Sequence, residues 1–376
     1  MKTFNNLPDL FTFFNGEKVL TKADWEKRRL ELIEWFSHNI YGEYEEEATK
    51  GFSFEVVSDI TDERCRKKTI KISKNGWESE FWLWLPLGRV KPAVIVHAIL
   101  QLYEEDGDKK FVLDKVDGYN KTPSVSTLPI GYLLDRGYAV CAYYVSRAAL
   151  DTVGGEDTNM NAMLIGENKT ATSARAISAW SFFAKRIADY LVTDEAVDGS
   201  RLAMTGHSRG GKTALYTAAT DERYSFAFVS NSGCTGAAIA RDNTGERIKD
   251  INDRFPHWFT QVYKGYNERE DELPVDFHQL IACIAPRRVL VSSSSEDAWA
   301  CPENEFASAV LASAVWEKIY SLKGLVAPSE PKLDEAYQGG CVAYHIKTGK
   351  HSFDFSDWIK CADYLDKMGW NNRERR

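Results

Sequence analysis

The sequence predicts an α/β fold in which helices cover both faces of a mostly parallel sheet. From residue 92 to the end of the 376-residue chain, short apolar runs typical of buried strands alternate with segments of helical periodicity. Parallel strands joined in this way need right-handed crossover connections. Residues 1–90 carry β-rich segments separated by turns, which predict antiparallel strands. We therefore expect a single domain over residues 1–376.

The N-terminal part, residues 1–90, contains one predicted helix and three predicted strands. Residues 22–38 carry apolar side chains at helical spacing behind Thr21, which is a suitable capping residue. The turn Lys74-Asn75-Gly76 predicts a hairpin between the last two strands. We expect the helix and these strands to pack onto the parallel part. The three predicted strands are residues 52–59, 66–74 and 78–86.

The remaining part, residues 91–376, supplies the parallel strands and their helices. Two polar excursions interrupt it, near residues 101–130 and 241–275. Long loops after central strands are often functional, so the first excursion is either a wall of a substrate cleft or a solvated loop. The predicted strands are 92–100, 137–146, the run Leu202-Ala203-Met204, 224–233, 287–295 and 340–348, and the predicted helices are 171–193, 276–286, 303–320 and 354–367.

A strand-turn-helix motif at residues 201–215 carries the main chemical signal. It reads RLAMTGHSRGGKTAL, which places G-x-S-x-G between an apolar run and a helix-forming segment. Gly206 and Gly210 suit a strained and closely packed turn, and Ser208 would present its hydroxyl at the apex. The context predicts the nucleophile of an α/β-hydrolase fold, whereas the plainer alternative is a glycine-rich turn.

A serine nucleophile needs a base to take its proton and a third group to orient that base. In the α/β-hydrolase order the acid and then the histidine follow the serine. Asp297 lies just beyond the strand at 287–295 and is favoured over its neighbour Glu296. His351 lies in the loop after the last strand, whereas His345 lies within that strand and is expected to be a core histidine. We predict a triad of Ser208, His351 and Asp297.

The tetrahedral intermediate of ester hydrolysis needs hydrogen-bond donors aimed at its oxyanion. The backbone N–H of Arg209 follows the nucleophile and is the first expected donor. A second donor is expected from the loop around Leu100-Gln101, after the strand at 92–100. The Arg209 guanidinium would add positive charge, unless it forms a surface or sheet-edge salt bridge instead.

Composition narrows the partners and cofactors. The net charge of −8 argues against nucleic acid or an anionic membrane as the main partner. Seven dispersed cysteines without C-x-x-C indicate buried thiols and predict neither a metal nor a disulfide framework. The N-terminus lacks a signal-peptide pattern, and no 18-residue apolar run occurs. The chain as given is expected to be cytoplasmic, although a trimmed periplasmic or secreted protein would look the same.

The segment Ser208-Arg209-Gly210-Gly211-Lys212 resembles the G-C-S-R-x-G-K elbow of the glucuronoyl esterases, the 4-O-methyl-glucuronoyl methylesterase family. The stretches 231–237 and 297–302 also look like segments of that family, and similar bacterial sequences are often labelled acetylxylan esterases. The resemblance covers roughly residues 90–365. It implies the same triad and a contribution of Arg209 to the oxyanion hole.

The resemblance also implies residues that contact the sugar. Lys212 would contact sugar hydroxyls, and Trp299 would pack against the uronate. The plainer alternatives are a solvated helix residue for Lys212 and a core side chain for Trp299. Trp258, in the second excursion, is expected to shape specificity.

Two positions depart from the family pattern. His207 replaces the family's cysteine before the nucleophile, and Asn231 stands where many members carry a glutamate. An amide cannot stabilise an imidazolium as a carboxylate does, so the acid is expected to be Asp297.

The sequence thus predicts a serine carbohydrate esterase that hydrolyses glucuronoyl-type esters without a cofactor. An acetyl or acetylxylan esterase is the nearest alternative, and a peptidase is a further one. A non-catalytic carbohydrate-binding protein of the same fold is the alternative from another class. The substrate is expected to be a small or oligosaccharide ester, and the sequence predicts no oligomeric state.

Overall fold

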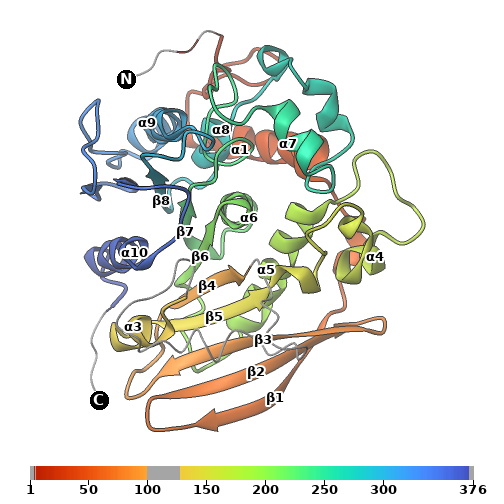
Figure 1. Ribbon diagram of the computed structural model, residues 1–376, viewed down its shortest axis with the longest axis vertical. Coiled ribbons are helices and arrows are strands. Elements are labelled where there is room, and N and C mark those ends of the chain that lie inside the picture. The colour runs from red at the N-terminus through yellow and green to blue at the C-terminus, as the bar shows by residue number, and fades with distance from the viewer. Residues whose placement is uncertain (1–3, 5, 100–127, 372–376) are drawn as a thin grey trace.

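A single ten-stranded sheet runs through the computed structural model, which describes residues 4, 6–99 and 128–371 (Figure 1). The strand order is β1-β2-β3-β5-β4-β6-β7-β8-β10-β9. Neighbours from β5 to β10 are parallel, whereas β1, β2, β3 and β9 pair antiparallel. The strands are β1 (Ser53–Thr61), β2 (Cys65–Lys74), β3 (Trp77–Pro86), β4 (Val94–Ile99), β5 (Ala139–Tyr144), β6 (Leu202–His207), β7 (Tyr224–Ser230), β8 (Arg288–Ser294), β9 (Ala336–Tyr337) and β10 (Val342–Lys347). The predicted mostly parallel α/β sheet is confirmed.

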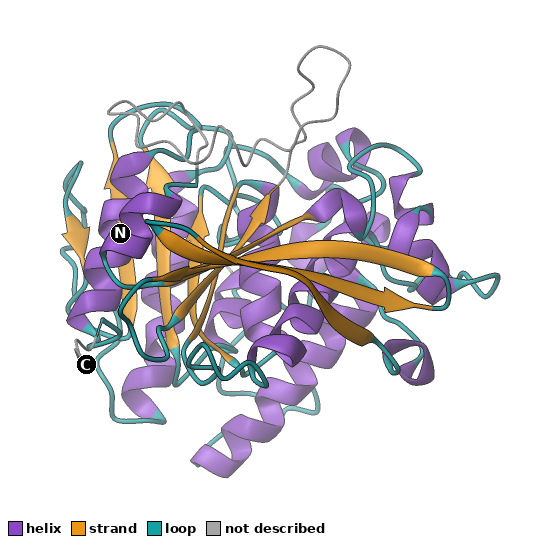
Figure 2. Cartoon of the chain, turned by 90° about the horizontal axis from the view of Figure 1, so that it is seen from below, coloured by secondary structure: helices purple, strands orange, loops and turns teal. Residues whose placement is uncertain are grey.

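Helices cover both faces of the sheet, as predicted (Figure 2). Successive residues of a strand point to opposite faces, so Val94 and Val96 join one core and Ile95 joins the other. The first core includes apolar residues of α1, α5, α6, α8 and α9, and the second includes those of α3 and α10. The helices are α1 (Lys22–Phe36), α3 (Ile130–Asp135), α4 (Asn159–Ile165), α5 (Ala176–Leu191), α6 (Arg209–Thr220), α7 (Ile248–Arg254), α8 (Phe277–Ala282), α9 (Pro302–Lys318) and α10 (Phe355–Lys367).

The N-terminal strands extend the sheet instead of packing onto it, which differs from our expectation. β3 pairs directly with β5 over Trp82–Trp84, so the antiparallel ribbon and the parallel strands share hydrogen bonds. The predicted hairpin of β2 and β3 is present and turns at Asn75 and Gly76, which both have positive φ. Because β3 and β5 pair, the backbone N–H and C=O groups where the antiparallel and parallel strands meet are hydrogen-bonded to each other. The single domain itself stays a prediction.

Other differences concern element boundaries and short elements. The helix predicted at 171–193 begins only at Ala176, because the backbone of residues 172–174 hydrogen-bonds to Glu43 in an isolated β-bridge. The elements α3, α4, α7 and β9 were not predicted, and each has seven residues or fewer. The excursion at 101–130 lies almost entirely outside the described residues. The excursion at 241–275 contains α7 and two short 3-10 turns.

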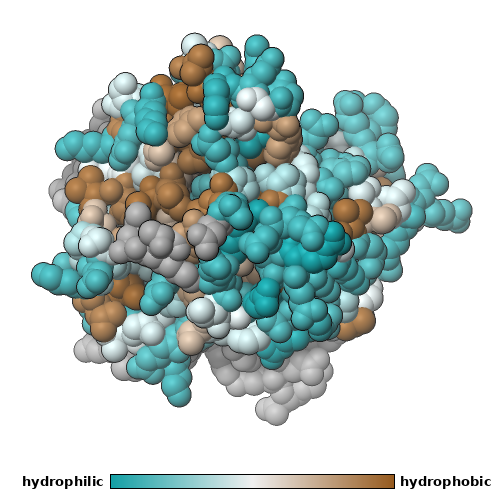
Figure 3. Space-filling view, turned by 90° about the horizontal axis from the view of Figure 1, so that it is seen from above, coloured by the Kyte–Doolittle hydropathy of each residue, from teal (hydrophilic) through white to brown (hydrophobic). Residues whose placement is uncertain are grey.

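The surface and the thiols fit a folded globular chain. Six of the seven cysteines are buried and Cys65 is half-buried, which confirms the prediction of buried thiols. Among the described residues, no helix combines the length and apolar character needed to cross a bilayer. The face in Figure 3 is largely hydrophilic, with apolar groups gathered toward one side.

Candidate active site

Ser208 lies at a sharp turn between β6 and α6, as the motif predicts. Its φ of 57° is positive, a conformation that costs on the order of 1–3 kcal/mol for a residue with a side chain. Its backbone N–H donates to Ser230 on β7 at 2.9 Å, which holds the turn against the neighbouring strand. A Cβ at Gly206 would lie 2.0 Å from the Gly210 carbonyl oxygen, so the turn requires glycine there. The strand-turn-helix geometry is therefore that of a nucleophile elbow.

Asp297 and His351 meet beyond the carboxyl ends of β8 and β10. The Nδ1 atom of His351 lies 2.5 Å from Oδ2 of Asp297. Asp297 is 4% exposed, whereas the His351 side chain is 44% exposed. The buried carboxylate accepts the Nδ1 proton, so Nε2 remains the basic nitrogen of the ring. The two residues predicted as acid and base thus form a pair.

The loop of His351 lies against the elbow. The ring centroids of His351 and His207, the residue before Ser208, are 4.5 Å apart. Phe353 stacks on His207 with ring centroids 5.6 Å apart. Burial and then the proximity of His351 hold the pKa of His207 well below its usual range, so that ring is neutral. His207 therefore packs beneath the base without adding charge.

Asn231 contributes a neutral hydrogen bond to the acid. It follows β7 at a positive φ of 43°. Its Nδ2 atom donates to Asp297 Oδ2 at 3.3 Å and to the hydroxyl of Ser294 at 2.7 Å. The amide therefore helps to orient the Asp297 carboxylate, and its position between two strand ends fixes it.

Glu305 is a second carboxyl group near Asp297 and was not predicted. It is fully buried in the first turn of α9. One of its oxygens accepts from the Gly233 N–H at 2.9 Å, and the other accepts from the Ser293 hydroxyl at 2.6 Å. Burial raises its pKa to about 7, against the effect of these hydrogen bonds. Glu305 joins the loop after β7 to the end of β8.

The Arg209 guanidinium forms an ion pair with Asp151. Asp151 also accepts from the Trp258 indole at 2.7 Å and from Nε2 of His257 at 2.9 Å. Burial opposes ionisation of Asp151, but these donors and Arg209 outweigh it and lower its pKa. The Arg209 guanidinium is thus ion-paired, but within a half-buried cluster and not in the surface or sheet-edge salt bridge of the plainer alternative. Trp258 is 3% exposed and stacks on Phe255, so it supports this cluster from within.

Lys212 and Trp299 converge on Glu246, which was not predicted either. The Trp299 indole donates to Glu246 at 3.0 Å, and the Lys212 ammonium lies 3.6 Å from the other oxygen. The ammonium also donates to the carbonyls of Ser232 and Cys234, both at 2.5 Å. Lys212 is 3% exposed and Trp299 is 44% exposed. Lys212 is therefore not a solvated helix residue, and Trp299 is not a core side chain.

Two further sequence candidates, the histidine His345 and the oxyanion donor expected at Leu100-Gln101, are not among the described residues that meet at the site. His345 is 1% exposed, and burial lowers its pKa to about 4, as expected of a core histidine. Leu100-Gln101, the expected second oxyanion donor, lies outside the described residues. Within the described ranges, no group of three or more His, Cys, Asp or Glu residues could hold a metal ion.

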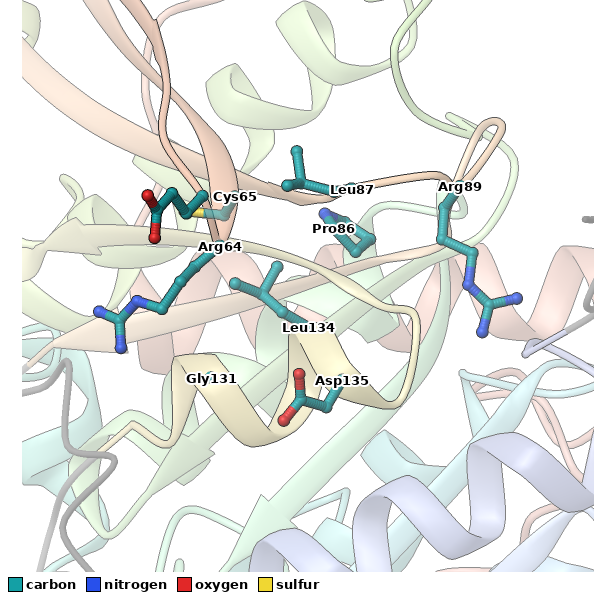
Figure 4. A pocket seen from close by; sticks show the side chains of 9 residues that line it. Arg64, Cys65, Pro86, Leu87, Arg89, Gly131, Leu134 and Asp135 are labelled. Atoms are coloured by element: carbon teal, nitrogen blue, oxygen red, sulfur yellow. The ribbon is translucent and has the colours of Figure 1, made fainter. Parts of the chain in front are cut away.

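A hollow of about 400 Å³ lies at the other end of the sheet (Figure 4). It is bordered by Arg64, Pro86 and Leu134, near the start of β5 and thus opposite to the strand ends that carry Ser208. Its lining contains no histidine beside a nucleophile. The candidate site is therefore the one at the carboxyl ends of β6, β7, β8 and β10.

The residues that sequence reasoning missed share one property. Asp151, Glu246 and Glu305 are single carboxylates without a local motif, and each reaches the site from a segment distant from the elbow. The acidic residues after β5 and in the excursion at 241–275 could have been named as candidate site residues. Their side-chain partners could not have been predicted from the sequence.

The comparisons with known proteins agree on one family. The family model for "Glucuronyl esterase, fungi" matches residues 124–319. Carbohydrate esterase MZ0003, from an unknown prokaryotic organism, is 30% identical over 390 residues, which cover 96% of this chain and 89% of that protein. A 4-O-methyl-glucuronoyl methylesterase of Podospora anserina is 26% identical over 333 residues, covering 85% of this chain and 61% of that protein.

The solved structures give the same result. A glucuronoyl esterase from Solibacter usitatus superposes with a TM-score of 0.85 at 30% identity, covering 97% of this chain and 98% of that one. The chain therefore spans nearly the whole length of these prokaryotic relatives and about three fifths of the Podospora protein.

Proposed function

The chain belongs to the glucuronoyl esterase family and is a carboxylic ester hydrolase, and on this premise we propose that it hydrolyses glucuronoyl esters with Ser208 as the nucleophile. The observation that carries the proposal is the pair of Asp297 and His351 at 2.5 Å, held over the elbow by the contact between His351 and His207. A base oriented in this way activates a serine hydroxyl that is otherwise a weak nucleophile.

The proposed reaction has two steps. His351 Nε2 takes the hydroxyl proton while Ser208 Oγ attacks the ester carbonyl, and it then gives that proton to the leaving alcohol. Water repeats the sequence on the acyl-enzyme and releases the free sugar acid. Asp297 keeps His351 in the tautomer with a basic Nε2 and stabilises the imidazolium. Asn231 supports Asp297 but supplies no charge.

Oxyanion stabilisation is assigned to the start of α6. The Arg209 N–H is the first of the helix, where no helical carbonyl can accept it, and the positive end of the helix dipole adds to its effect. The Arg209 guanidinium supplies further positive charge, and Leu100-Gln101 remains the proposed source of a second N–H.

Sugar binding is assigned to the group around Glu246. The half-exposed Trp299 ring offers a flat apolar wall for a sugar ring, and Glu246 fixes the indole orientation. Lys212, whose ammonium lies 3.6 Å from Glu246, contributes positive charge to the same group. We assign Trp258 to the support of Arg209, since its indole N–H is already donated to Asp151.

A substrate panel tests the proposal. Purified protein is assayed on benzyl glucuronate and on acetylated xylo-oligosaccharides, each with the Ser208→Ala variant as control. The proposal predicts turnover of benzyl glucuronate that Ser208→Ala abolishes. Turnover of the acetylated substrate alone would replace the glucuronoyl assignment by the acetyl esterase alternative. Undiminished hydrolysis by Ser208→Ala would refute the nucleophile.

A further inference from the structure

Asp151 occupies a built acceptor site at the carboxyl edge of the sheet. It follows β5 by a few residues, and its side chain is 14% exposed. One carboxylate oxygen accepts from His257 and Trp258, and the other pairs with Arg209. Three donors from two distant segments therefore converge on one carboxylate.

The partners of Asp151 are themselves fixed. The carbonyl of His257 accepts from the Ala176 N–H at 3.0 Å, which ties it to the start of α5. Trp258 stacks on Phe255 with ring centroids 3.8 Å apart and 4° between the planes. The acceptor is thus held by a rigid aromatic and backbone framework.

Arg209, in contrast, depends on this framework for the position of its guanidinium. Its side chain is long and flexible, and only its backbone is placed by α6. The guanidinium lies 5.3 Å from the Trp258 ring centre and 6.0 Å from the Phe255 ring centre, while Asp151 holds one of its terminal nitrogens. Among the described residues, its buried Nε atom has no hydrogen-bond acceptor. The framework therefore orients the cation and leaves one of its donors unused.

We propose that Asp151 is a positioning residue that holds the Arg209 guanidinium where charge develops on the ester oxygen. The inference rests on the proposed function, in which Arg209 stabilises the oxyanion. Asp151 acts only through Arg209. The hydrogen bonds of His257 and Trp258 act through Asp151, and the Trp258 ring also contacts the guanidinium. Because the contact matters to a charge that exists only in the transition state, its loss lowers kcat and leaves KM little changed.

A double-mutant cycle on a glucuronoyl ester tests the proposal. Arg209→Ala removes the cation, and we expect kcat to fall about 100-fold. Asp151→Asn keeps the size of the side chain but misplaces the cation, and we expect kcat to fall about tenfold or more. In the Arg209→Ala background, Asp151→Asn should lower kcat by less than about twofold, because nothing remains to position.

A matched control and a milder variant complete the design. Asp157→Asn removes an exposed carboxylate from the same segment, where it pairs with Lys169, and should leave kcat within about twofold of the parent. Trp258→Phe keeps an aromatic side chain but removes one donor to Asp151. This variant replaces Asp151→Asn if the latter does not fold. It should lower kcat about threefold in the parent and not in the Arg209→Ala background.

The outcomes separate this inference from the proposed function. If Arg209→Ala lowers kcat but the effects of Asp151→Asn and Arg209→Ala multiply, Asp151 acts independently and the inference is wrong. A rise in KM with unchanged kcat would also overturn it. If Arg209→Ala itself has no effect while Ser208→Ala abolishes turnover, the oxyanion role of Arg209 fails and the inference fails with it, whereas the nucleophile stands.

Discussion

Glu305 should make the stability of this protein depend on pH between about 4.5 and 7. Its carboxyl group is fully buried and accepts hydrogen bonds from Ser232, Gly233 and Ser293. Burial raises its pKa from 4.5 to about 7, and the nearby charge of Asp297 acts in the same direction. The folded state therefore holds a proton that the unfolded state releases in this range.

The sign and the size follow from linkage. Below pH 4.5 both states bind the proton, so its full stabilisation is present. As the pH rises to about 7, the unfolded state loses the proton first, and the free energy of unfolding falls. A pKa difference of about 2.5 units corresponds to about 3 kcal/mol, since each unit is worth about 1.4 kcal/mol. Above pH 7 this contribution levels off.

Urea unfolding of the parent and of Glu305→Gln at several pH values between 4.5 and 7.5 measures this effect. The neutral amide cannot titrate, so the free energy of unfolding of the parent should fall by about 3 kcal/mol relative to that of Glu305→Gln across the range. Glu303→Gln, which changes an exposed carboxylate two residues earlier, should run parallel to the parent. If the free energy of unfolding of Glu305→Gln varies with pH in the same way as that of the parent, Glu305 does not have a raised pKa in the folded state.

Three further substitutions test other parts of the site. Asn231→Ala removes the 3.3 Å hydrogen bond to Asp297 and should lower kcat about fivefold in steady-state assays; an unchanged kcat would exclude this orienting contact. Trp299→Ala removes the exposed wall beside Glu246 and should raise KM for a glucuronoyl ester about tenfold, whereas an unchanged KM would place the sugar elsewhere. Gly206→Ala places a Cβ 2.0 Å from a backbone oxygen and should lower the free energy of unfolding by about 3 kcal/mol in urea titrations; a stability equal to the parent would contradict the turn geometry.

The strongly patterned parts of the fold could be predicted from the sequence. The buried strands are continuous apolar runs, and the elbow places small residues around Ser208 where the turn requires them. The order of strand ends then placed Asp297 and His351 at one edge of the sheet, where they do form a hydrogen bond. These predictions rest on local patterns and on the topology of parallel sheets.

The rest depended on long-range contacts that no local pattern encodes. Asp151 reaches Arg209 across 58 positions of the chain, and Glu246 reaches Trp299 across 53. The pairing of β3 with β5 likewise depends on tertiary packing. The amino-acid composition of β3 would be the same whether it joined the parallel strands or belonged to a separate antiparallel ribbon. Lys212 was predicted to contact the sugar, but its burial was not predicted, because lysine is rarely buried unless it is paired, as it is here.

The central claim is that Ser208 is the nucleophile and that His351 activates it, and covalent trapping tests this most directly. The protein is treated with a reactive aryl phosphonate, and the modified residue is located by peptide mass spectrometry. The account predicts one adduct, on Ser208, formed at least about 1,000-fold more slowly by His351→Ala. An adduct on another residue, or equal labelling of Ser208→Ala, would contradict it.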